Sequence, residues 1–431
     1  MTDTPRSMRR HRITWLPSSI FDTFQLPPTP PYTQLLTVGC ADDFYAVRVG
    51  LANVTRGAWC ADRLIARPST TWNDLANPTG DAEWVPLTFA HQGTDSATIA
   101  SGPGLPTGLT VSGNQIDPGT GLTTNPAWTW TDWSPIRSLP RADAPDGHRV
   151  LMFRMLVPQG QMITYANGNY GAYAGDTALH GGFEHATGKF DGDIVTNPVP
   201  VDPEKTFRGQ GINSIVCVQY LTRNPGVTFM VTGDSHQIGT STLTQFSSAV
   251  LYGVVAAGVP LVGRFPLGYV NCATGGATSD QYFARPRDLL PSVKPGVVIL
   301  PGWTANDLPF ATLDTDAVGD RFIARLLLAA ESCDDHGAIP IFLTPFPHDR
   351  TFMTDERTRS WNLLRETVMG FRANGRIVLD AATILGEQTG GALDGIYKPE
   401  LTDDNVHPND SGHRALATAL TPLMAAVADL R

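Results

Sequence analysis

The sequence has no long uninterrupted run of apolar residues. Its longest nearly apolar stretch, 249–262, is too short to cross a lipid bilayer and is interrupted by glycine and proline. The N-terminal segment, 1–24, carries four arginines but no apolar core of a secretory signal peptide. We therefore expect no transmembrane segment. A cytoplasmic location follows by default, and export by another route stays open.

The chain also lacks an excess of positive charge and has few cysteines. Its formal net charge of −10 and its pI of about 5.4 argue against nucleic acid or an anionic membrane as the main partner. The five cysteines do not have the close spacing of a zinc site or a disulfide framework. Cys40 and Cys60 lie at a plausible separation for a disulfide bridge, and the sequence leaves open whether they form one.

A complete metal-binding spacing is missing as well. His180, Glu184 and His185 resemble part of a metal-ligand set, and Asp191 and Asp193 resemble part of a calcium loop. Solvated loop side chains account for both groups better than an incomplete ligand set does. We therefore expect no metal ion and no cofactor.

The first half of the chain contains short apolar segments separated by turns. The hydrophobic content of 42% allows a sizeable core, and 42 glycines and 34 prolines indicate many turns. Residues 1–36 are punctuated by proline and predict an extended arm on the surface, whereas 158–206 predicts a long loop. Strands are predicted at 44–51, 87–89, 97–99, 149–157 and 215–220. This pattern predicts an all-β sandwich domain, jelly-roll-like, over residues 1–225.

Tryptophan is concentrated in this first half. Seven of the nine tryptophans lie in residues 1–133, among them Trp128, Trp130 and Trp133. Such a cluster can stack on sugar rings, although packing in a core or an interface is the more frequent reason for it. A glycan-binding role of the β domain is therefore one open interpretation.

From about residue 226 the pattern changes to strands that alternate with helices. Asn224-Pro225-Gly226 interrupts the chain, and we place the boundary there, with a second domain at 226–431. Strands are predicted at 227–232, 268–273, 297–301, 338–344 and 376–380, and helices near 240–257, 316–335, 355–373 and 411–421. This alternation predicts an α/β domain in which a parallel sheet is covered by helices on both faces. In such sheets, ligands bind beyond the carboxyl ends of the strands.

A serine follows the first of these strands. The apolar run 227–231 ends at Gly233-Asp234-Ser235, and a helical pattern begins after Gly239. A serine on such a turn projects from the sheet edge, and its backbone N–H lies near the positive end of the following helix. Both features suit a nucleophile whose attack creates an oxyanion. Asp and Ser are also preferred N-cap residues, so the turn alone allows a purely structural role.

Three later loops contain suitable partners. The second strand leads into a glycine-rich loop, in which the N–H of Gly276 is a potential donor, and the third leads into a loop with Asn306. The loop before the last helix places Asp404 and His407 three residues apart, as needed for a base oriented by a carboxylate. Each loop also has a plain structural explanation, as a turn glycine, an Asx-turn or a helix start.

The order of these motifs resembles that of the GDSL/SGNH hydrolase superfamily, over roughly residues 226–431. The first block of that family, Gly-Asp-Ser with a glycine four residues beyond the serine, matches Gly233 to Gly239. The glycine of the second block falls on Gly276, with Gly275 as the alternative.

The other two blocks differ in how well they match. The third normally reads Gly-x-Asn-Asp, and here two extra residues separate Gly302 from Asn306. The last block, Asp-x-x-His, is matched in full by Asp404 and His407. Asp403 and His413 are the off-register competitors for these two positions. A looser likeness of the region around 48–53 suggests the jelly-roll-like module that precedes such domains in some bacterial esterases.

The resemblance implies a flavodoxin-like SGNH domain with serine esterase activity and no metal or cofactor. It implies that Ser235 is the nucleophile, His407 the base and Asp404 the residue that orients it. It further implies an oxyanion hole made by Ser235, Gly276 and Asn306. The expected substrate is a small-molecule or glycan ester, most simply an acetyl ester of a carbohydrate. The alternatives are acyl transfer, a lipid or thioester acyl hydrolase, and a glycan-binding attachment protein with a degenerate hydrolase domain.

Overall fold

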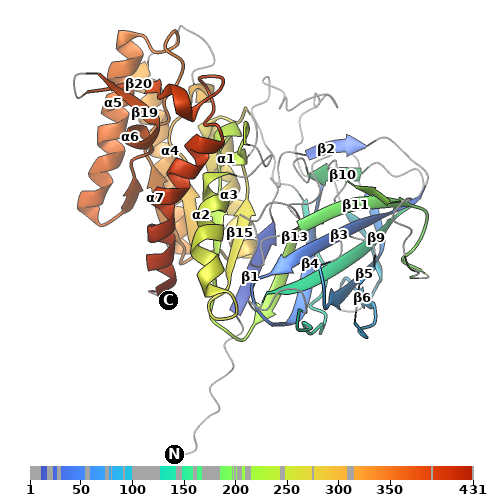
Figure 1. Ribbon diagram of the computed structural model, residues 1–431. Helices are drawn as coiled ribbons and strands as arrows, with labels where there is room; N and C mark the ends of the chain where they lie inside the picture. The colour runs from blue at the N-terminus through green and yellow to red at the C-terminus, as the bar shows by residue number, and fades with distance from the viewer. Residues whose placement is uncertain are drawn as a thin grey trace, which may run out of the picture.

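The structure is a computed structural model. It describes residues 11–16, 23–26, 31–53, 59–72, 77–78, 80–90, 93–99, 127–141, 148–158, 163–166, 185–196, 198, 200, 206–208, 215–242, 248–273, 276–307, 315–389 and 392–429. Figure 1 shows one half built from strands and a second half in which strands are covered by helices.

The second half is built on five parallel strands. They are β14 (Val227–Val231), β15 (Leu267–Asn271), β16 (Val297–Leu300), β17 (Ile339–Leu343) and β18 (Ile377–Leu379). Their spatial order is β18-β17-β16-β14-β15, with every neighbouring pair parallel. This is the flavodoxin-like order, which places the topological switch point between β14 and β16. The five predicted strands and their parallel arrangement are therefore confirmed.

Helices cover both faces of these strands. The helices are α1 (Ser235–Ile238), α2 (Ala249–Gly258), α3 (Ser279–Val293), α4 (Thr315–Asp335), α5 (Asp355–Gly370), α6 (Ala381–Leu385) and α7 (Asp410–Asp429). Alternate strand residues face opposite layers: Phe229 shares a buried cluster with α2 and α7, whereas Met230 shares one with α3, α4 and α5. Burial on both faces explains why each strand is a continuous apolar run. A short hairpin, β19 (Gly386–Thr389) and β20 (Ala392–Tyr397), completes this half.

Several helices differ from the prediction. Helices α1 and α6 were not predicted, and α7 continues to Asp429 instead of ending near 421. The helix predicted near 240–257 begins only at Ala249, where the side chain of Ser248 caps it by accepting from the N–H of Leu251. Helix α1 ends at Ile238, and its C-cap Gly239 has a left-handed φ of 89°. Helix α3 was not predicted, because Pro286 and Pro291 interrupt its sequence and lower its intrinsic helix propensity.

The described part of the first half contributes strands. They are β1 (His11–Leu16), β2 (Thr23–Leu26), β3 (Tyr32–Cys40), β4 (Phe44–Asn53), β5 (Trp59–Ser69), β6 (Val85–Leu87), β7 (Ser96–Ile99), β8 (Ala127–Trp130), β9 (Arg149–Val157), β10 (Ile163–Ala166), β11 (His185–Asp191), β12 (Thr206–Arg208) and β13 (Ile215–Thr222). Strands β12-β11-β3-β9-β5-β6 form one antiparallel sheet, with β7 on β5, and β13-β4-β8 belong to another. Side chains of both sheets, such as Leu36, Val49 and Phe153, share one buried cluster. The region 158–206, predicted as a loop, contains β10 and β11.

Strand β1 joins the two halves. It pairs antiparallel with β13 and parallel with β15, so that one nine-stranded sheet runs from β18 to β8. Figure 1 shows β1 between the strands of the two halves. Residues 1–36 were predicted to form a surface arm. Instead, 11–16 lie inside this sheet, where they cover the backbone edges of β13 and β15, 23–26 pair with β10, and 32–36 belong to β3. The boundary predicted at 225/226 falls between β13 and β14, and the sheet continues across it.

The cysteines and the helices add two further facts. None of the five cysteines forms a disulfide, so Cys40 and Cys60 are not bridged. Within the part of the chain that the structure describes, no helix is both long and apolar enough to span a bilayer.

Candidate active site

Ser235 lies on a tight turn after β14, at the switch point of the sheet. Gly233 has φ +148°, Asp234 is the N-cap residue, and Ser235 is the first residue of α1. A Cβ on Gly233 would lie 2.2 Å from Oε1 of Gln237, and that oxygen accepts a hydrogen bond from the N–H of Asp234 at 3.2 Å. The turn therefore requires a residue without a side chain at position 233.

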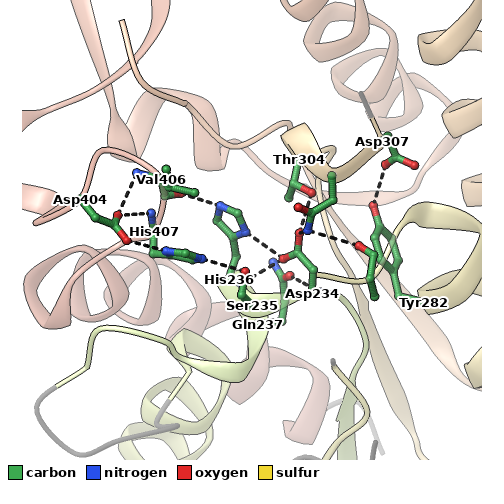
Figure 2. Close-up of polar contacts among 12 residues, drawn as sticks. Asp234, Ser235, His236, Gln237, Tyr282, Thr304, Asp307, Asp404, Val406 and His407 are labelled. Atoms are coloured by element: carbon green, nitrogen blue, oxygen red, sulfur yellow. Dashed lines mark hydrogen bonds and ion pairs between the residues drawn. The ribbon is translucent and has the colours of Figure 1, made fainter. Parts of the chain in front are cut away.

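The structure brings Ser235, His407 and Asp404 together in one line of hydrogen bonds. Oγ of Ser235 lies 2.8 Å from Nε2 of His407, and Nδ1 of His407 lies 2.7 Å from Oδ2 of Asp404. Figure 2 shows this line, with the serine on α1 and the other two residues on the loop before α7. With Nδ1 protonated toward the carboxylate, Nε2 is free to accept the serine proton. This is the geometry of a nucleophile, a base and an orienting carboxylate.

The loop that carries His407 is fixed by its own hydrogen bonds. Oδ1 of Asp404 accepts from the backbone N–H groups of Val406 and His407, at 2.9 and 2.7 Å. The hydroxyl of Thr402 donates to the carbonyl of His407 and accepts from the N–H of Asn405, both at 2.8 Å. These bonds hold the imidazole in one orientation.

The pKa values of Asp404 and His407 suit an ionised carboxylate beside a base that is neutral before the reaction. Partial burial raises the pKa of Asp404, but the bonds from His407 and from the backbone outweigh it and lower the value to about 2. Burial is the main reason why the pKa of His407 is lowered, with the charge of His236 second, and Asp404 opposes both. His407 is therefore neutral at neutral pH and able to accept a proton.

Asp234 connects the serine turn to a second loop. Its side chain is fully buried, and Oδ2 accepts from the hydroxyl of Thr304 at 2.6 Å and from Nδ2 of Asn306 at 2.7 Å. Nδ2 of Asn306 also donates to the carbonyl of Ala277 at 3.3 Å. Both N–H bonds of the Asn306 amide thus have an acceptor in this structure.

The other two predicted oxyanion donors are backbone groups. The N–H of Ser235 is in the first turn of α1, where N–H groups have no acceptor inside the helix. Gly276 has φ +71°, and a Cβ there would meet no atom within 4 Å. It directly precedes Ala277, whose carbonyl binds Asn306. The alternative, Gly275, lies outside the described residues.

The two extra residues of the third block have a structural function. Gly302 lies so close to the chain just after β17 that a Cβ would be 1.9 Å from the carbonyl oxygen of Thr344. The insertion then brings Thr304 to Asp234, and a 3-10 turn, Ala305–Asp307, carries Asn306. The loop therefore reaches the serine turn despite its unusual length.

The off-register competitors are occupied elsewhere. Asp403 accepts from Nδ2 of Asn409 at 2.9 Å. His413 is buried in α7, where Nδ1 accepts from the N–H of Ala249 at 3.1 Å. Asp404 and His407 are therefore the pair that faces the serine.

The remaining candidates from the sequence are the potential metal ligands of the first half. His180 and Glu184 are outside the described residues, and Asp193 accepts from the N–H groups of Val195 and Thr196 in its own loop. In the described part of the chain, no group of three His, Cys, Asp or Glu side chains is placed to hold a metal ion.

Two of the predicted tryptophans pack on an arginine. The guanidinium of Arg48 lies 4.5 Å from the ring centre of Trp130 and 4.8 Å from that of Trp133. Nε of Arg48 also donates to Gln219 at 2.7 Å. These contacts give both rings a packing role in the β half, as cation–π partners.

His236 was not among the predicted site residues. His236 is 4% exposed and connects Asp234 to the carbonyl of Val406, the residue before His407. A histidine next to a candidate nucleophile was the available signal in the sequence, but its partner lies in a loop far along the chain.

The chain is similar to solved structures over about half of its length. A G-D-S-L family protein from Desulfitobacterium hafniense DCB-2 is 18% identical, with 46% of this chain and 99% of that chain covered and a TM-score of 0.36. The acetylxylan esterase Axe2 from Geobacillus stearothermophilus is 20% identical, with 46% and 94% covered and a TM-score of 0.36. A lipase/acylhydrolase from Enterococcus faecalis is 20% identical, with 46% and 96% covered and a TM-score of 0.35.

No protein-family model matches the chain, and no curated protein matches it. The similarity to GDSL/SGNH hydrolases therefore comes from the four sequence blocks and from the solved structures named above. At TM-scores of 0.35 to 0.36 the likeness carries no weight for the substrate or the mechanism. Both have to be inferred from the residues of this chain.

Proposed function

We propose that the protein is a serine hydrolase of carboxylic esters. The observation that carries this proposal is the continuous hydrogen-bonded line from Ser235 through His407 to Asp404. A hydroxyl next to a neutral imidazole, itself oriented by an ionised carboxylate, is what acyl transfer through an acyl-enzyme requires.

In the first half of the reaction, Oγ of Ser235 attacks the ester carbonyl carbon while Nε2 of His407 takes its proton. The tetrahedral intermediate then expels the alcohol, which leaves with the proton from His407. In the second half, water attacks the acyl-enzyme and gives its proton to His407. The acid departs, and the proton returns to Oγ.

The oxyanion is bound, in this proposal, by the N–H groups of Ser235 and Gly276 and by the amide of Asn306. The two bonds of Asn306 differ in length: the one to Asp234 is 2.7 Å and the one to Ala277 is 3.3 Å. We expect the longer bond to be exchanged for the oxyanion, while the shorter one holds the amide in place. Removal of one such donor typically costs about 10²–10³ in kcat.

We propose further that the acyl group is short, with an acetyl ester of a carbohydrate as the first candidate. In this proposal the β half holds the glycan, and the sequence has no apolar segment suited to a lid over a long acyl chain. Each methylene group that is buried in an acyl pocket contributes about 0.8 kcal/mol of binding free energy. The preference for acyl chain length therefore reports the length of the pocket.

The test is turnover of p-nitrophenyl esters of increasing chain length by the wild type and by Ser235→Ala. We expect hydrolysis of the acetyl ester by the wild type and a loss of about 10⁶-fold in kcat in the variant. Asp404→Asn should lose about 10⁴-fold, because the imidazole then adopts the wrong tautomer. Asp403→Asn is the matched control and should retain activity.

Each alternative has a distinct outcome. Equal turnover by wild type and Ser235→Ala contradicts the serine assignment. A clear preference for acyl chains above about eight carbons favours a lipid or thioester substrate over acetyl. Glycan binding without turnover of any ester favours a binding protein with a degenerate hydrolase domain.

A further inference from the structure

His236 lies between the two halves of the candidate active site. It follows Ser235 on α1, and its ring reaches both Asp234 and the loop of His407. Figure 2 shows the ring between the carboxylate of Asp234 and the carbonyl of Val406. Neither the line of hydrogen bonds from Ser235 to Asp404 nor the oxyanion donors use this side chain.

The hydrogen bonds of the ring define its charge. Nδ1 lies 2.8 Å from Oδ1 of Asp234, and Nε2 lies 2.7 Å from the carbonyl oxygen of Val406. A carbonyl oxygen and an ionised carboxylate are both acceptors, so both ring nitrogens of His236 must carry a proton. The other partners of Asp234 favour its ionised form, because it also accepts from the backbone N–H of His236 and from the amide of Asn306.

Asp234 and His236 would carry their charges in a buried position. Asp234 is fully buried and His236 is 4% exposed, so neither charge is compensated by water. Burial alone raises the pKa of Asp234, but the charge of His236 and the hydrogen bonds outweigh it and lower that pKa. Burial likewise lowers the pKa of His236, and Asp234 with the carbonyl of Val406 more than reverses it. Both directions agree with an ion pair.

We propose that His236, as an imidazolium held by Asp234, is a positioning residue that fixes the loop of His407 against the turn of Ser235. It acts through the carbonyl of Val406, one residue before the base. Its contact thus sets the separation of Oγ and Nε2, now 2.8 Å. Through Asp234, the same pair also holds Thr304 and Asn306, so that serine, base and oxyanion donor share one buried anchor. The catalytic part of this inference depends on the proposed ester hydrolysis.

The pair also places a positive charge near the base. The ring centres of His236 and His407 are 5.1 Å apart, and the charged groups facing His407 are His236, Asp404 and Asp234. Burial first, and this nearby cation second, disfavour protonation of His407, so the acid limb of kcat/KM should lie below the usual imidazole pKa of 6.5. The charge of His236 also contributes to the lowered pKa values of two further histidines. Burial first, and that charge second, lower the pKa of His348 to about 4 and of His413 to about 3, so both are neutral at pH 7.

The charge state is tested on the full chain without any change at position 236. In Ser235→Ala, ¹⁵N NMR of the histidine rings should show both nitrogens of His236 protonated at pH 7 to 8, while His407 is neutral. An unprotonated ring nitrogen in His236 at that pH overturns the proposal. This measurement needs no turnover, so it is decided separately from the esterase activity.

The positioning role is tested with two substitutions that each keep one contact. In His236→Gln the amide can still reach the carbonyl of Val406, and in His236→Asn it can reach only Asp234. We expect kcat for p-nitrophenyl acetate to fall about 10²-fold in His236→Asn and less in His236→Gln, with little change in KM. In both variants the acid limb of kcat/KM should move to higher pH, because the cation next to His407 is gone.

His336→Gln, at an exposed position in the turn that follows α4, is the control and should change neither quantity. The proposal is overturned if His236→Asn keeps wild-type kcat and the wild-type pH limb. Absence of any ester turnover in the wild type would instead reject the proposed function and leave the NMR result to decide the charge of His236.

Discussion

At the scale of single residues, two glycines shape the candidate site because they carry no side chain. Gly233 allows the turn before Ser235 to adopt φ +148°. Gly302 allows the loop of Asn306 to lie against the carbonyl of Thr344, the residue that follows β17. In the second case the obstacle is backbone, so the neighbour is unable to rotate away.

We expect Gly302→Ala to destabilise the protein by about 1–3 kcal/mol, because the added methyl overlaps the backbone of Thr344 and Pro345. Urea unfolding measures this, and esterase activity should fall with it because Asn306 is displaced. Gly319→Ala is the matched control. It lies in helix α4 with no atom within 4 Å of the new methyl, and should stabilise the chain by about 0.4–1 kcal/mol. Equal stability of the two variants contradicts this explanation of Gly302.

The sequence alone predicted those site residues that belong to a sequence motif. Ser235, Asp404 and His407 each follow a strand or precede a helix, and their spacing matches a family pattern. The contact of His236 with Val406 was not predictable in this way, because a backbone carbonyl gives no signal in a sequence. The bonds of Asn306 to Asp234 and Ala277 were likewise visible only in three dimensions.

At the scale of elements, hydrophobic runs predicted the five parallel strands well because both of their faces are buried. Helix α3 was missed because its stability comes from packing of residues such as Tyr282 and Leu289 rather than from helix propensity. A buried carboxylate also fixes its first turn. Oδ1 of Asp307 accepts from the N–H and the hydroxyl of Ser279, at 2.9 and 2.6 Å.

We therefore expect Asp307→Ala to lower the free energy of unfolding by about 1–3 kcal/mol, because the donors of Ser279 lose their acceptor. Chemical denaturation checks the value. Asp320→Ala, at an exposed position on α4, removes the same charge without a buried contact and should change stability by at most about 0.5 kcal/mol. A similar loss in both variants would show that net charge, and not the link to α3, is responsible.

At the scale of the whole molecule, β1 makes one sheet out of two halves. Its partners β13 and β15 lie more than 190 residues further along the chain, and the local sequence pattern of 11–16 does not predict this pairing. The change of pattern near residue 226 predicted where the helical half begins, but it gave no sign that the sheet continues across that point.

Because the sheet is continuous through β1, we can predict how stable the second half is as a separate fragment. A fragment of residues 226–431 lacks β1, so it exposes the edge of β15, which is buried in the full chain. We expect it to self-associate in size-exclusion chromatography and to unfold at a lower temperature than the full chain. A chain that lacks only residues 1–10 keeps β1 and serves as the control. A monomeric fragment with the Tm of the full chain contradicts the structural role of β1.

The central claim is that Ser235 is acylated with the help of His407. The most direct measurement is mass spectrometry of peptides from protein mixed rapidly with p-nitrophenyl acetate and quenched in acid. We predict one acetyl group per chain on the peptide that contains Ser235, and none at that position in Ser235→Ala. Ester turnover with the acetyl group on another residue, or with no acyl-enzyme and full activity in Ser235→Ala, would contradict the account.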